Sequence, residues 1–314
     1  MTSILVIGCG YMGAEYSKVL DDLSIESFFV GNSAQGVQEF HTRTGKHAFT
    51  GGLEDYLDQD HEIDFDAAII ATNINYLKAH TTLLIKKGIR KILVEKPVAL
   101  DIEDLEELNS TAKKYGSEIF VAYNRRFYTS TQYLKYELGI YKKNVLGVAE
   151  ITEFEHLIRK SDEPDVVKQK WMIANTSHVL DMMFFLLDYP NDLKSFSANP
   201  VTWHKSSIFS GSGKTESNNL LTYHGFWGST GRWGLDIYLE DRFYSFKPLE
   251  KLYITDAPSR ERTLVTLDYS DDEQFKPGLK KMINDFTLTK PKDLPTISDQ
   301  IRLSKIIYQI AGYE

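Results

Sequence analysis

The stretch that decides the fold is ILVIGCGYMG, residues 4–13, where a short apolar run ends in three spaced glycines. The apolar run predicts a buried strand, and the residues after it have helical spacing. The glycines match G-x-G-x-x-G, in which the first permits a tight turn, the second lets the backbone approach a pyrophosphate, and the third lets helix and strand pack closely. We therefore expect Gly8, Gly10 and Gly13, with Tyr11 and Met12 between them, to bind a dinucleotide at the start of a helix.

The first part of the chain continues this alternation of strands and helices. Strands are predicted at 4–7, 27–30, 67–71, 92–94 and 119–122, and helices at 12–23, 34–44, 76–87 and 101–115. Such alternation predicts a parallel sheet with helices on both faces, which binds ligands beyond the carboxyl ends of its strands. We assign residues 1–122 to a Rossmann dinucleotide-binding domain of the α/β class.

The pattern changes after residue 122. Helices are predicted at 131–138, 176–187, 272–289 and 298–311, a loop at 159–165, and strands at 145–154, 196–201, 220–226, 231–239, 242–246, 251–255 and 263–267. Closely spaced strands with two-residue alternation form hairpins. We therefore expect residues 123–314 to form a C-terminal α+β domain with a largely antiparallel open sheet.

The composition argues against several functional classes. Acidic residues outnumber basic ones by 44 to 36, giving a net charge of -8, so nucleic acid is not an expected partner. The single cysteine, Cys9, cannot form an internal disulfide, and no Cys/His cluster has metal-ligand spacing, so we expect a cytoplasmic protein with no metal site. No apolar run is long enough to span a membrane, and the N-terminus reads as a strand and not as a signal peptide.

The end of the second predicted strand bears on the choice of cofactor. An Asp or Glu there would bind the adenosine ribose hydroxyls, but this chain has Gly31, Asn32 and Ser33. A missing carboxylate removes the repulsion of a 2'-phosphate, although no arginine stands in the turn and Arg43 is a helix away. We expect NAD or NADP, with NADP slightly favoured and contacted by Asn32 and Ser33.

A second informative stretch is ILVEKP, residues 92–97, in which a predicted strand ends in Glu95, Lys96 and Pro97. Charged groups that end an interior strand are costly to desolvate unless they are paired or used, so Lys96 is a candidate for chemistry. The alternative is a surface lysine followed by a proline that ends the strand.

With these motifs the chain resembles the glucose-fructose oxidoreductase / inositol dehydrogenase / MocA (Gfo/Idh/MocA) family over essentially its full length. The resemblance rests on the glycine motif, Ala71-Thr72-Asn73 with His80 downstream, GIRKILVEKP at 88–97, YNRRF at 123–127, and His178-Val179-Leu180-Asp181. It implies that the cofactor also contacts Ala71, Thr72, Asn73, Glu95 and Lys96.

The resemblance implies hydride transfer between NAD(P) and a carbon of a sugar, amino sugar, cyclitol or nucleotide-linked sugar. Lys96 would hydrogen-bond the reacting hydroxyl and stabilise the charge that develops on it, while Glu95 and Pro97 position the lysine. His178 would take up or return the proton beside the nicotinamide. Asp181, three residues later on the same helical face, would orient the imidazole.

One position departs from the family pattern. Many of its dehydrogenases have an aspartate four residues before the histidine, where this chain has Ala174 followed by Asn175 as a polar replacement. Without that carboxylate the family's proton relay is incomplete, which leaves open a substrate geometry or a reaction direction different from that of an inositol-type dehydrogenase. A catalytically silent NAD(P)-binding sensor and a reductase of a non-sugar molecule remain alternatives, and His178 could instead cap or pack its helix.

Polar residues also follow the last strand of the first domain. There, Tyr123, Asn124, Arg125 and Arg126 are candidates to contact the substrate, since a guanidinium can clamp a carboxylate or phosphate. The arginines could equally form ion pairs between domains. The resemblance implies that residues 123–314 bind the substrate and mediate oligomerisation. The open sheet of this domain needs a cover, and the resemblance implies a homodimer or homotetramer.

Overall fold

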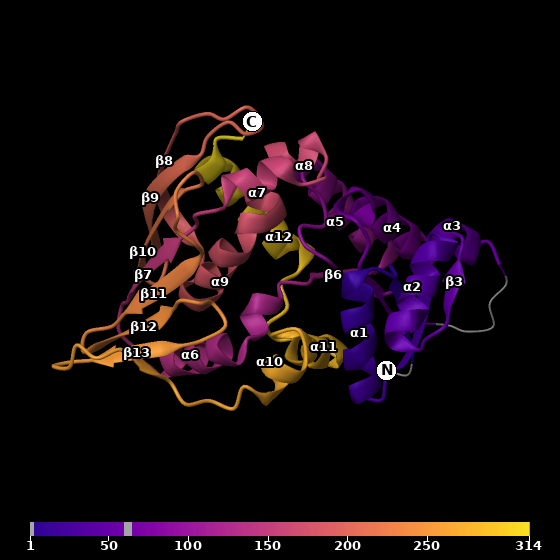
Figure 1. The fold of residues 1–314 in the computed structure, drawn as a ribbon, viewed down its shortest axis with the longest axis horizontal. Helices are drawn as coiled ribbons and strands as arrows, with labels where there is room; N and C mark the ends of the chain where they lie inside the picture. The colour runs from indigo at the N-terminus through magenta and orange to yellow at the C-terminus, as the bar shows by residue number, and fades with distance from the viewer. Residues whose placement is uncertain (1–2, 60–64, 314) are drawn as a thin grey trace. The chain divides into compact units, whose positions relative to one another are not determined.

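The computed structural model describes residues 3–59 and 65–313, and the chain divides into two compact units (Figure 1). The first unit runs to Asn124 and takes up Ser270–Ile301 again, whereas the second contains Arg125–Tyr269 and the residues from Arg302 onward.

The first unit is built on a six-stranded parallel sheet with the strand order β3-β2-β1-β4-β5-β6. Its strands are β1 (Ser3–Ile7), β2 (Glu26–Gly31), β3 (Ala48–Thr50), β4 (Ala67–Ile70), β5 (Lys91–Val94) and β6 (Glu118–Val121). The strands β1, β4 and β5 are buried along their whole length, which explains their continuous apolar runs. This sheet confirms the predicted Rossmann fold, and its strand order reverses between β1 and β4, where such sheets bind ligands.

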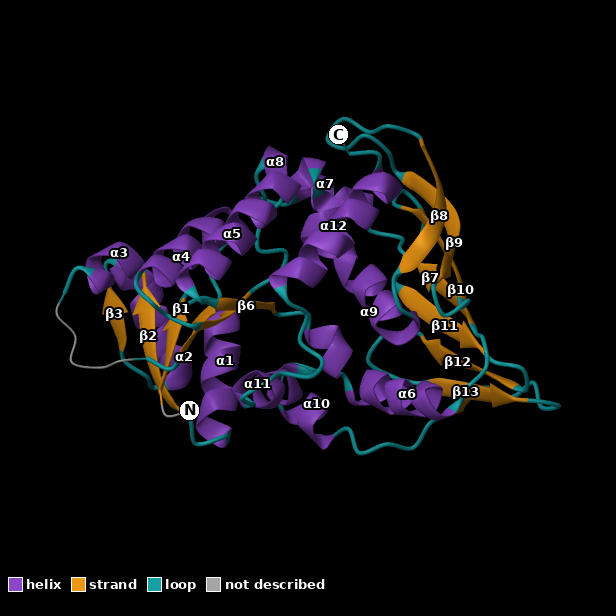
Figure 2. Cartoon of the chain, turned by 180° about the vertical axis from the view of Figure 1, so that it is seen from behind, coloured by secondary structure: helices purple, strands orange, loops and turns teal. Residues whose placement is uncertain are grey.

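Helices lie on both faces of this sheet, with α1 and α2 on one side and α4 and α5 on the other (Figure 2). They are α1 (Tyr11–Asp22), α2 (Ala34–Thr44), α3 (Gly52–Leu57), α4 (Ile74–Lys86) and α5 (Ile102–Tyr115). Helix α2 has the predicted bounds, because Ser33 caps its N-terminus and Gly45 ends it in a left-handed conformation with φ +73°. The short elements β3 and α3 were not predicted.

The chain returns to the first unit after the second sheet. This segment contains α10 (Ser270–Gln274) and α11 (Leu279–Thr287). Gly278, with φ +75°, separates the two helices where a single helix was predicted. The ring of Phe286 meets that of Phe120 edge to face at 6.2 Å, and the Val121 N–H donates to the Pro295 carbonyl at 2.9 Å, so the segment covers the outer edge of β6.

The predicted domains, 1–122 and 123–314, therefore differ from the division by contacts. The sequence placed residues 270–301 in the second domain because they follow its strands, but they pack on the first sheet. Chain order alone does not tell on which sheet a later amphipathic helix buries its apolar side.

The second unit is built on an eight-stranded sheet with the order β14-β13-β12-β11-β7-β10-β9-β8, which is antiparallel apart from the parallel pair β7 and β10. Its strands are β7 (Leu146–Glu150), β8 (Pro190–Ala198), β9 (Ile208–Thr215), β10 (Leu220–Phe226), β11 (Gly234–Tyr238), β12 (Arg242–Phe246), β13 (Tyr253–Asp256) and β14 (Thr263–Leu264). The sheet confirms the predicted largely antiparallel architecture, and β10 and β12 have the predicted bounds.

Strand β9 was not predicted because its sequence, IFSGSGKT, is rich in Gly and Ser. A Cβ on Gly211 would lie 2.3 Å from the Tyr223 hydroxyl of the neighbouring β10. The glycine therefore makes room for a buried ring inside a regular strand.

Helix α9 (Ser177–Leu187) lies against one face of this sheet, and the other helices of the second unit lie on the same side of the sheet or beyond α9 (Figure 2). The others are α6 (Thr129–Ile140), α7 (Glu155–Lys160), α8 (Asp165–Gln169) and the C-terminal part of α12 (Ile297–Ala311). Helix α7 ends at Lys160 and α8 begins at Asp165, so both overlap the ends of the stretch 159–165 that was predicted as a loop. Within the part of the chain that the structure describes, no helix has the length and apolar character needed to cross a bilayer.

Candidate active site

The carboxyl ends of β1, β2 and β4 surround a cavity of about 540 Å³ in the first unit, which we call the cofactor cavity. Most residues predicted to bind a dinucleotide line it, namely Gly8, Gly10, Tyr11, Asn32, Ser33, Ala71, Thr72 and Asn73. Two others, Met12 and Gly13, belong to α1, and Glu95 and Lys96 follow β5.

The glycines shape the turn between β1 and α1. Gly8 has φ +116°, and a Cβ on Gly13 would lie only 2.0 Å from the Gly8 carbonyl oxygen. A Cβ on Gly10, by contrast, would meet no described atom within 4 Å. Since α1 begins at Tyr11 and Gly10 offers no side-chain cap, the first N–H groups of the helix are available to an anion. The turn fits a pyrophosphate.

The side of the cofactor cavity next to β2 carries charges of both signs. Arg43, from the last turn of α2, lines the cavity together with Asn32 and Ser33. Its guanidinium lies 3.9 Å from the Glu39 carboxylate, and Glu54 of α3 lines the same cavity. An arginine suits a 2'-phosphate and a carboxylate suits ribose hydroxyls, so these residues fit NADP as well as NAD. The sequence did not place Arg43 or Glu54 here, because they follow β2 by a helix and by a further strand.

Glu95, Lys96 and Pro97 directly follow strand β5, at the carboxyl edge of the sheet that also bears the cofactor cavity. The Lys96–Pro97 peptide is cis. The Tyr16 hydroxyl donates to Glu95 Oε1 at 2.8 Å, and burial raises the pKa of this carboxyl, although Tyr16 and Lys96 act to lower it. Val98 has φ +72°, a rare conformation for a β-branched residue, so the turn that carries Lys96 stores backbone strain, as functional sites often do.

In the second unit, His178 lies in the first turn of α9 and is buried, with 7% of its surface exposed. A π-helical turn, Met172–Thr176, precedes α9, and such turns are frequent at functional sites. The centroid of the imidazole lies 6.3 Å from that of the Trp233 ring.

Asp181 and Arg126 form a buried, bidentate ion pair in the second unit. Arg126 Nε donates to Asp181 Oδ2 at 2.8 Å, and Arg126 Nη2 donates to Asp181 Oδ1 at 2.6 Å. Arg126 is therefore held by an internal partner, and both Asp181 oxygens accept from it.

The neighbouring candidates lie in different surroundings. Tyr123 and Asn124 are buried in the first unit, where Asn124 Nδ2 donates to the Pro277 carbonyl at 2.9 Å. Arg125, at the start of the second unit, lines a separate cavity.

Sequence reasoning missed Glu153, a buried carboxylate just after β7. Its Oε1 accepts hydrogen bonds from Thr176 Oγ1 (2.7 Å), Asn175 Nδ2 (3.0 Å) and Trp171 Nε1 (3.2 Å). Its Oε2 lies 3.4 Å from Arg232 Nη1. Burial raises the pKa of Glu153, and these partners act to lower it. No local motif marks this residue, because its partners come from the turn before α9 and from beyond β10.

Comparisons with known proteins agree with the fold. Residues 2–123 match a family model described as an oxidoreductase family with an NAD-binding Rossmann fold. No functionally curated protein matches the sequence.

Solved structures of the same fold cover nearly the whole chain at low identity. An oxidoreductase from Agrobacterium radiobacter, in complex with NAD+, L-tartaric acid and magnesium, has a TM-score of 0.77 at 13% identity, covering 99% of this chain and 96% of that one. A UDP-N-acetylglucosamine 3-dehydrogenase from Acidithiobacillus ferrooxidans has a TM-score of 0.73 at 19% identity, with 99% and 96% coverage. A levoglucosan dehydrogenase in complex with NADH and L-sorbose has a TM-score of 0.75 at 15% identity, with 99% and 96% coverage.

Proposed function

We propose that this protein transfers a hydride between NAD(P) and a carbon of a carbohydrate-like substrate, because residues 2–123 match the model of the Gfo/Idh/MocA oxidoreductase family, with its NAD-binding Rossmann fold. The observation that carries the proposal is the position of Lys96, just after β5 at the sheet edge that bears the cofactor cavity. The proposed substrates are a sugar, amino sugar, cyclitol or nucleotide-linked sugar. Dehydrogenases of UDP-N-acetylglucosamine and levoglucosan share the fold, which favours this class.

The residues of the cofactor cavity are proposed to hold NAD or NADP. The N–H groups at the start of α1 and the open space over Gly10 suit the pyrophosphate. Arg43, beside Asn32 and Ser33, supports acceptance of NADP in addition to NAD. When bound, the nicotinamide supplies or accepts the hydride.

Lys96 and His178 are proposed to manage the proton and the charge on the reacting oxygen. In the oxidation direction, the Lys96 ammonium hydrogen-bonds the hydroxyl and stabilises the negative charge that develops as the proton leaves. His178 accepts that proton and returns it in the reverse reaction, for which an imidazole is suited near neutral pH. Glu95 and Pro97 position the lysine through the turn after β5.

The test is a screen of sugars, sugar acids, sugar phosphates and nucleotide-linked sugars with NAD+ and NADP+, followed by the absorbance of the reduced nicotinamide. We expect turnover of at least one substrate, which falls in Lys96→Ala but not in Lys290→Ala, an exposed lysine of the same unit. Cofactor binding without turnover of any substrate would reject the enzyme and favour a sensor.

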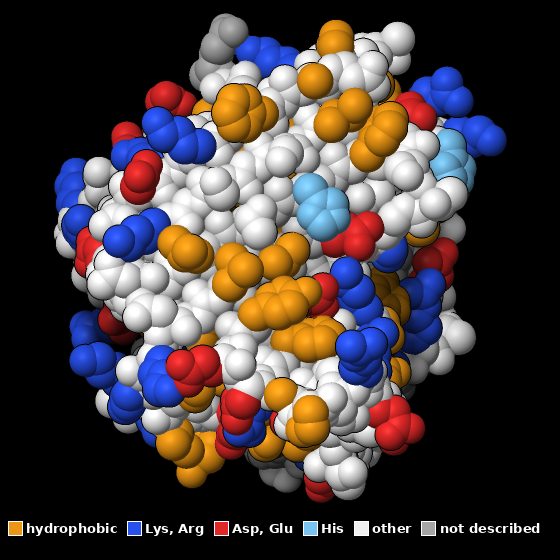
Figure 3. All heavy atoms as spheres, turned by 90° about the vertical axis from the view of Figure 1, so that its left-hand side faces the viewer, with side chains coloured by type: hydrophobic (Ala, Val, Ile, Leu, Met, Phe, Trp, Pro, Cys, Tyr) orange, Lys and Arg blue, Asp and Glu red, His pale blue; other side chains and the backbone are white. Residues whose placement is uncertain are grey.

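Exposed apolar side chains gather on the open face of the second sheet (Figure 3). They come from neighbouring strands and, by their register, point to one side: Leu146, Phe196, Leu220, Phe226 and Tyr238. Since exposed apolar patches on a sheet face mark interfaces, we propose that a second copy of the chain covers this face in a homodimer or homotetramer. Light scattering should show an oligomer that Phe196→Glu dissociates, and a monomeric wild type would reject it. A cytoplasmic location stays a prediction from the sequence.

A further inference from the structure

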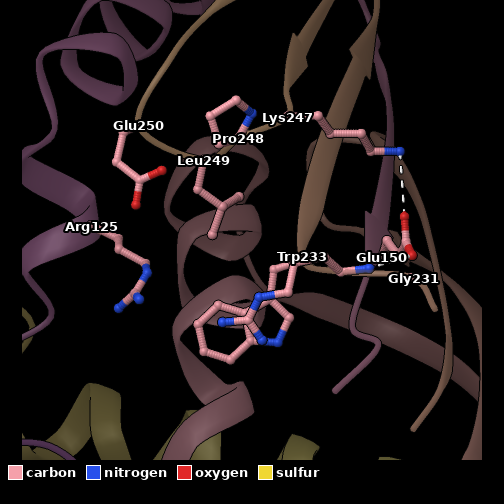
Figure 4. A pocket seen from close by; sticks show the side chains of 9 residues that line it. Arg125, Glu150, Gly231, Trp233, Lys247, Pro248, Leu249 and Glu250 are labelled. Atoms are coloured by element: carbon pink, nitrogen blue, oxygen red, sulfur yellow. Dashed lines mark hydrogen bonds and ion pairs between the residues drawn. The ribbon is translucent and has the colours of Figure 1, made fainter. Parts of the chain in front are cut away.

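A second cavity, of about 460 Å³, lies within the second unit and is called the Arg125 cavity below (Figure 4). The residues on which its chemistry depends are Arg125, Glu150, Arg232, Trp233, Lys247 and Glu250. They come from the start of the unit, the end of β7, the approach to β11 and the turn after β12. Three cationic side chains, two carboxylates and an indole therefore line the Arg125 cavity.

Two side chains that line this cavity each carry a buried hydrogen-bond donor without an acceptor. The Nε of Arg125 and the indole Nε1 of Trp233 are buried and make no hydrogen bond to any described residue. Trp233 as a whole is only 6% exposed, and the Arg125 guanidinium lies over its ring at 5.0 Å from the centroid. Buried donors are nearly always paired in folded proteins. Both side chains line the same cavity, so it is the place where a ligand with acceptor oxygens would meet them.

The charge balance of the cavity singles out Arg125. Lys247 Nζ lies 3.6 Å from Glu150 Oε2, and Arg232 is paired with Glu153 at 3.4 Å. Arg125, by contrast, forms no ion pair with any residue in the described ranges 3–59 and 65–313. Its guanidinium is therefore the cation of this cavity that is available to pair with a ligand.

The Arg125 cavity adjoins the histidine that is proposed to move the proton. Trp233 lines the cavity on one side, and its ring centroid lies 6.3 Å from that of His178. A ligand anchored over Trp233 would therefore place its neighbouring atoms close to the imidazole.

We propose that the Arg125 cavity binds an anionic group of the substrate, a carboxylate or a phosphate, so that the enzyme selects acidic or phosphate-bearing sugars over neutral ones. Arg125 offers a two-pronged contact to such a group, and the Trp233 ring supports its guanidinium from one side. Arg232, 4.7 Å from the Trp233 centroid, closes the site as a second cation. Glu153 is a positioning residue that holds Arg232. The inference rests on the proposed function, because it names the substrate class of the same enzyme.

Glu250 allows the effect of charge on ligand binding in this cavity to be tested. Its carboxylate lines the same cavity and forms no ion pair with Arg125 (Figure 4). A negative charge there opposes the binding of an anion, so Glu250→Gln should tighten binding while Arg125→Ala weakens it.

The experiment measures binding of glucose, glucuronate and glucose 1-phosphate to the full chain by calorimetry, in the presence of NADH. We expect the anionic sugars to bind at least about tenfold more tightly than glucose, and Arg125→Ala to weaken them by about 10- to 150-fold, as expected for charged hydrogen bonds. Arg125→Lys should restore only part of the loss, because an ammonium lacks the planar fork. Arg260→Ala removes an exposed arginine of the same unit and should change nothing.

The two anionic sugars distinguish the carboxylate from the phosphate. Equal binding of all three sugars, no binding of either anionic sugar at millimolar concentration, or full affinity in Arg125→Ala would overturn the inference. If the enzyme turns over neutral sugars and Arg125→Ala does not change this turnover, the anion-binding inference is wrong but the proposed dehydrogenase activity stands. If the protein binds anionic sugars but transfers no hydride, the anion-binding inference stands and the proposed dehydrogenase activity is wrong.

Discussion

Replacing Gly10 or Gly13 of the turn between β1 and α1 by alanine should affect cofactor binding and stability differently. Gly10 has φ -80° and ψ -162°, which alanine adopts freely, and its Cβ would meet no described atom within 4 Å. Gly10→Ala should therefore melt within about 2 °C of the wild type, since it changes stability by only a few tenths of a kcal/mol. The new methyl group would, however, stand over the first N–H groups of α1.

The expected loss in Gly10→Ala is therefore in binding. Displacing the pyrophosphate from these N–H groups should cost about 1.5–3 kcal/mol, which weakens NADH binding by roughly 10- to 150-fold. Gly13→Ala should behave differently, because its Cβ would lie 2.0 Å from the Gly8 carbonyl oxygen, far inside the 3.4 Å at which ordinary contact begins. Both groups belong to the backbone, so the overlap should cost about 1–3 kcal/mol or more and lower the melting temperature by several degrees.

Circular dichroism melting curves and fluorescence titration with NADH measure the two effects on the same samples. Unchanged NADH affinity in Gly10→Ala would show that no pyrophosphate lies against α1. A Gly13→Ala protein as stable as the wild type would contradict the close packing of the turn.

Substitutions at three further sites, His204, Asp181 and Arg43, give distinct expected outcomes. Burial lowers the pKa of His204 from 6.5 to about 4, against the opposing effect of the Ser206 carbonyl, so the unfolded chain takes up the proton first. As the pH falls from 6.5 to about 4, the stability of the second unit should decrease by roughly 3 kcal/mol, and urea melts of His204→Gln should lack this slope. Asp181→Ala leaves the Arg126 guanidinium buried without its carboxylate and should cost about 3–5 kcal/mol in urea melts, whereas the paired change to Asp181→Leu with Arg126→Met should cost less. Arg43→Ala should weaken NADPH by about tenfold in fluorescence titration and NADH little, and equal losses for both cofactors would argue against a 2'-phosphate contact.

The first sheet was predictable because each buried parallel strand leaves a continuous apolar run in the sequence. Helix α2 was predicted to the residue, since Ser33 and Gly45 mark its ends through local chemistry. Strand β9 was missed because Gly211 serves the packing of Tyr223, a residue on another strand. The docking of residues 270–301 on the first sheet was missed for the same reason, since the Val121 to Pro295 hydrogen bond joins distant parts of the chain.

The residues of the candidate site were likewise predictable only where their signal lies in the local sequence. The glycine turn and the end of β5 were found because their function depends on residues that are adjacent in sequence. Arg43 and Trp233 line the two cavities, and Glu153 meets its hydrogen-bond partners, only through tertiary packing, so their local sequence carries no signal. The ion pair of Asp181 with Arg126 likewise joins a helix to a turn 55 residues earlier.

The most direct test of the central claim compares the turnover of Lys96→Ala, His178→Ala and the double variant with that of the wild type. If both groups act on the same reacting oxygen, each single variant loses about 100-fold or more in kcat with NADH binding intact, and the double variant loses little beyond the worse single one. Wild-type turnover in either single variant, or losses that multiply in the double variant, would contradict a shared role in one proton and hydride transfer.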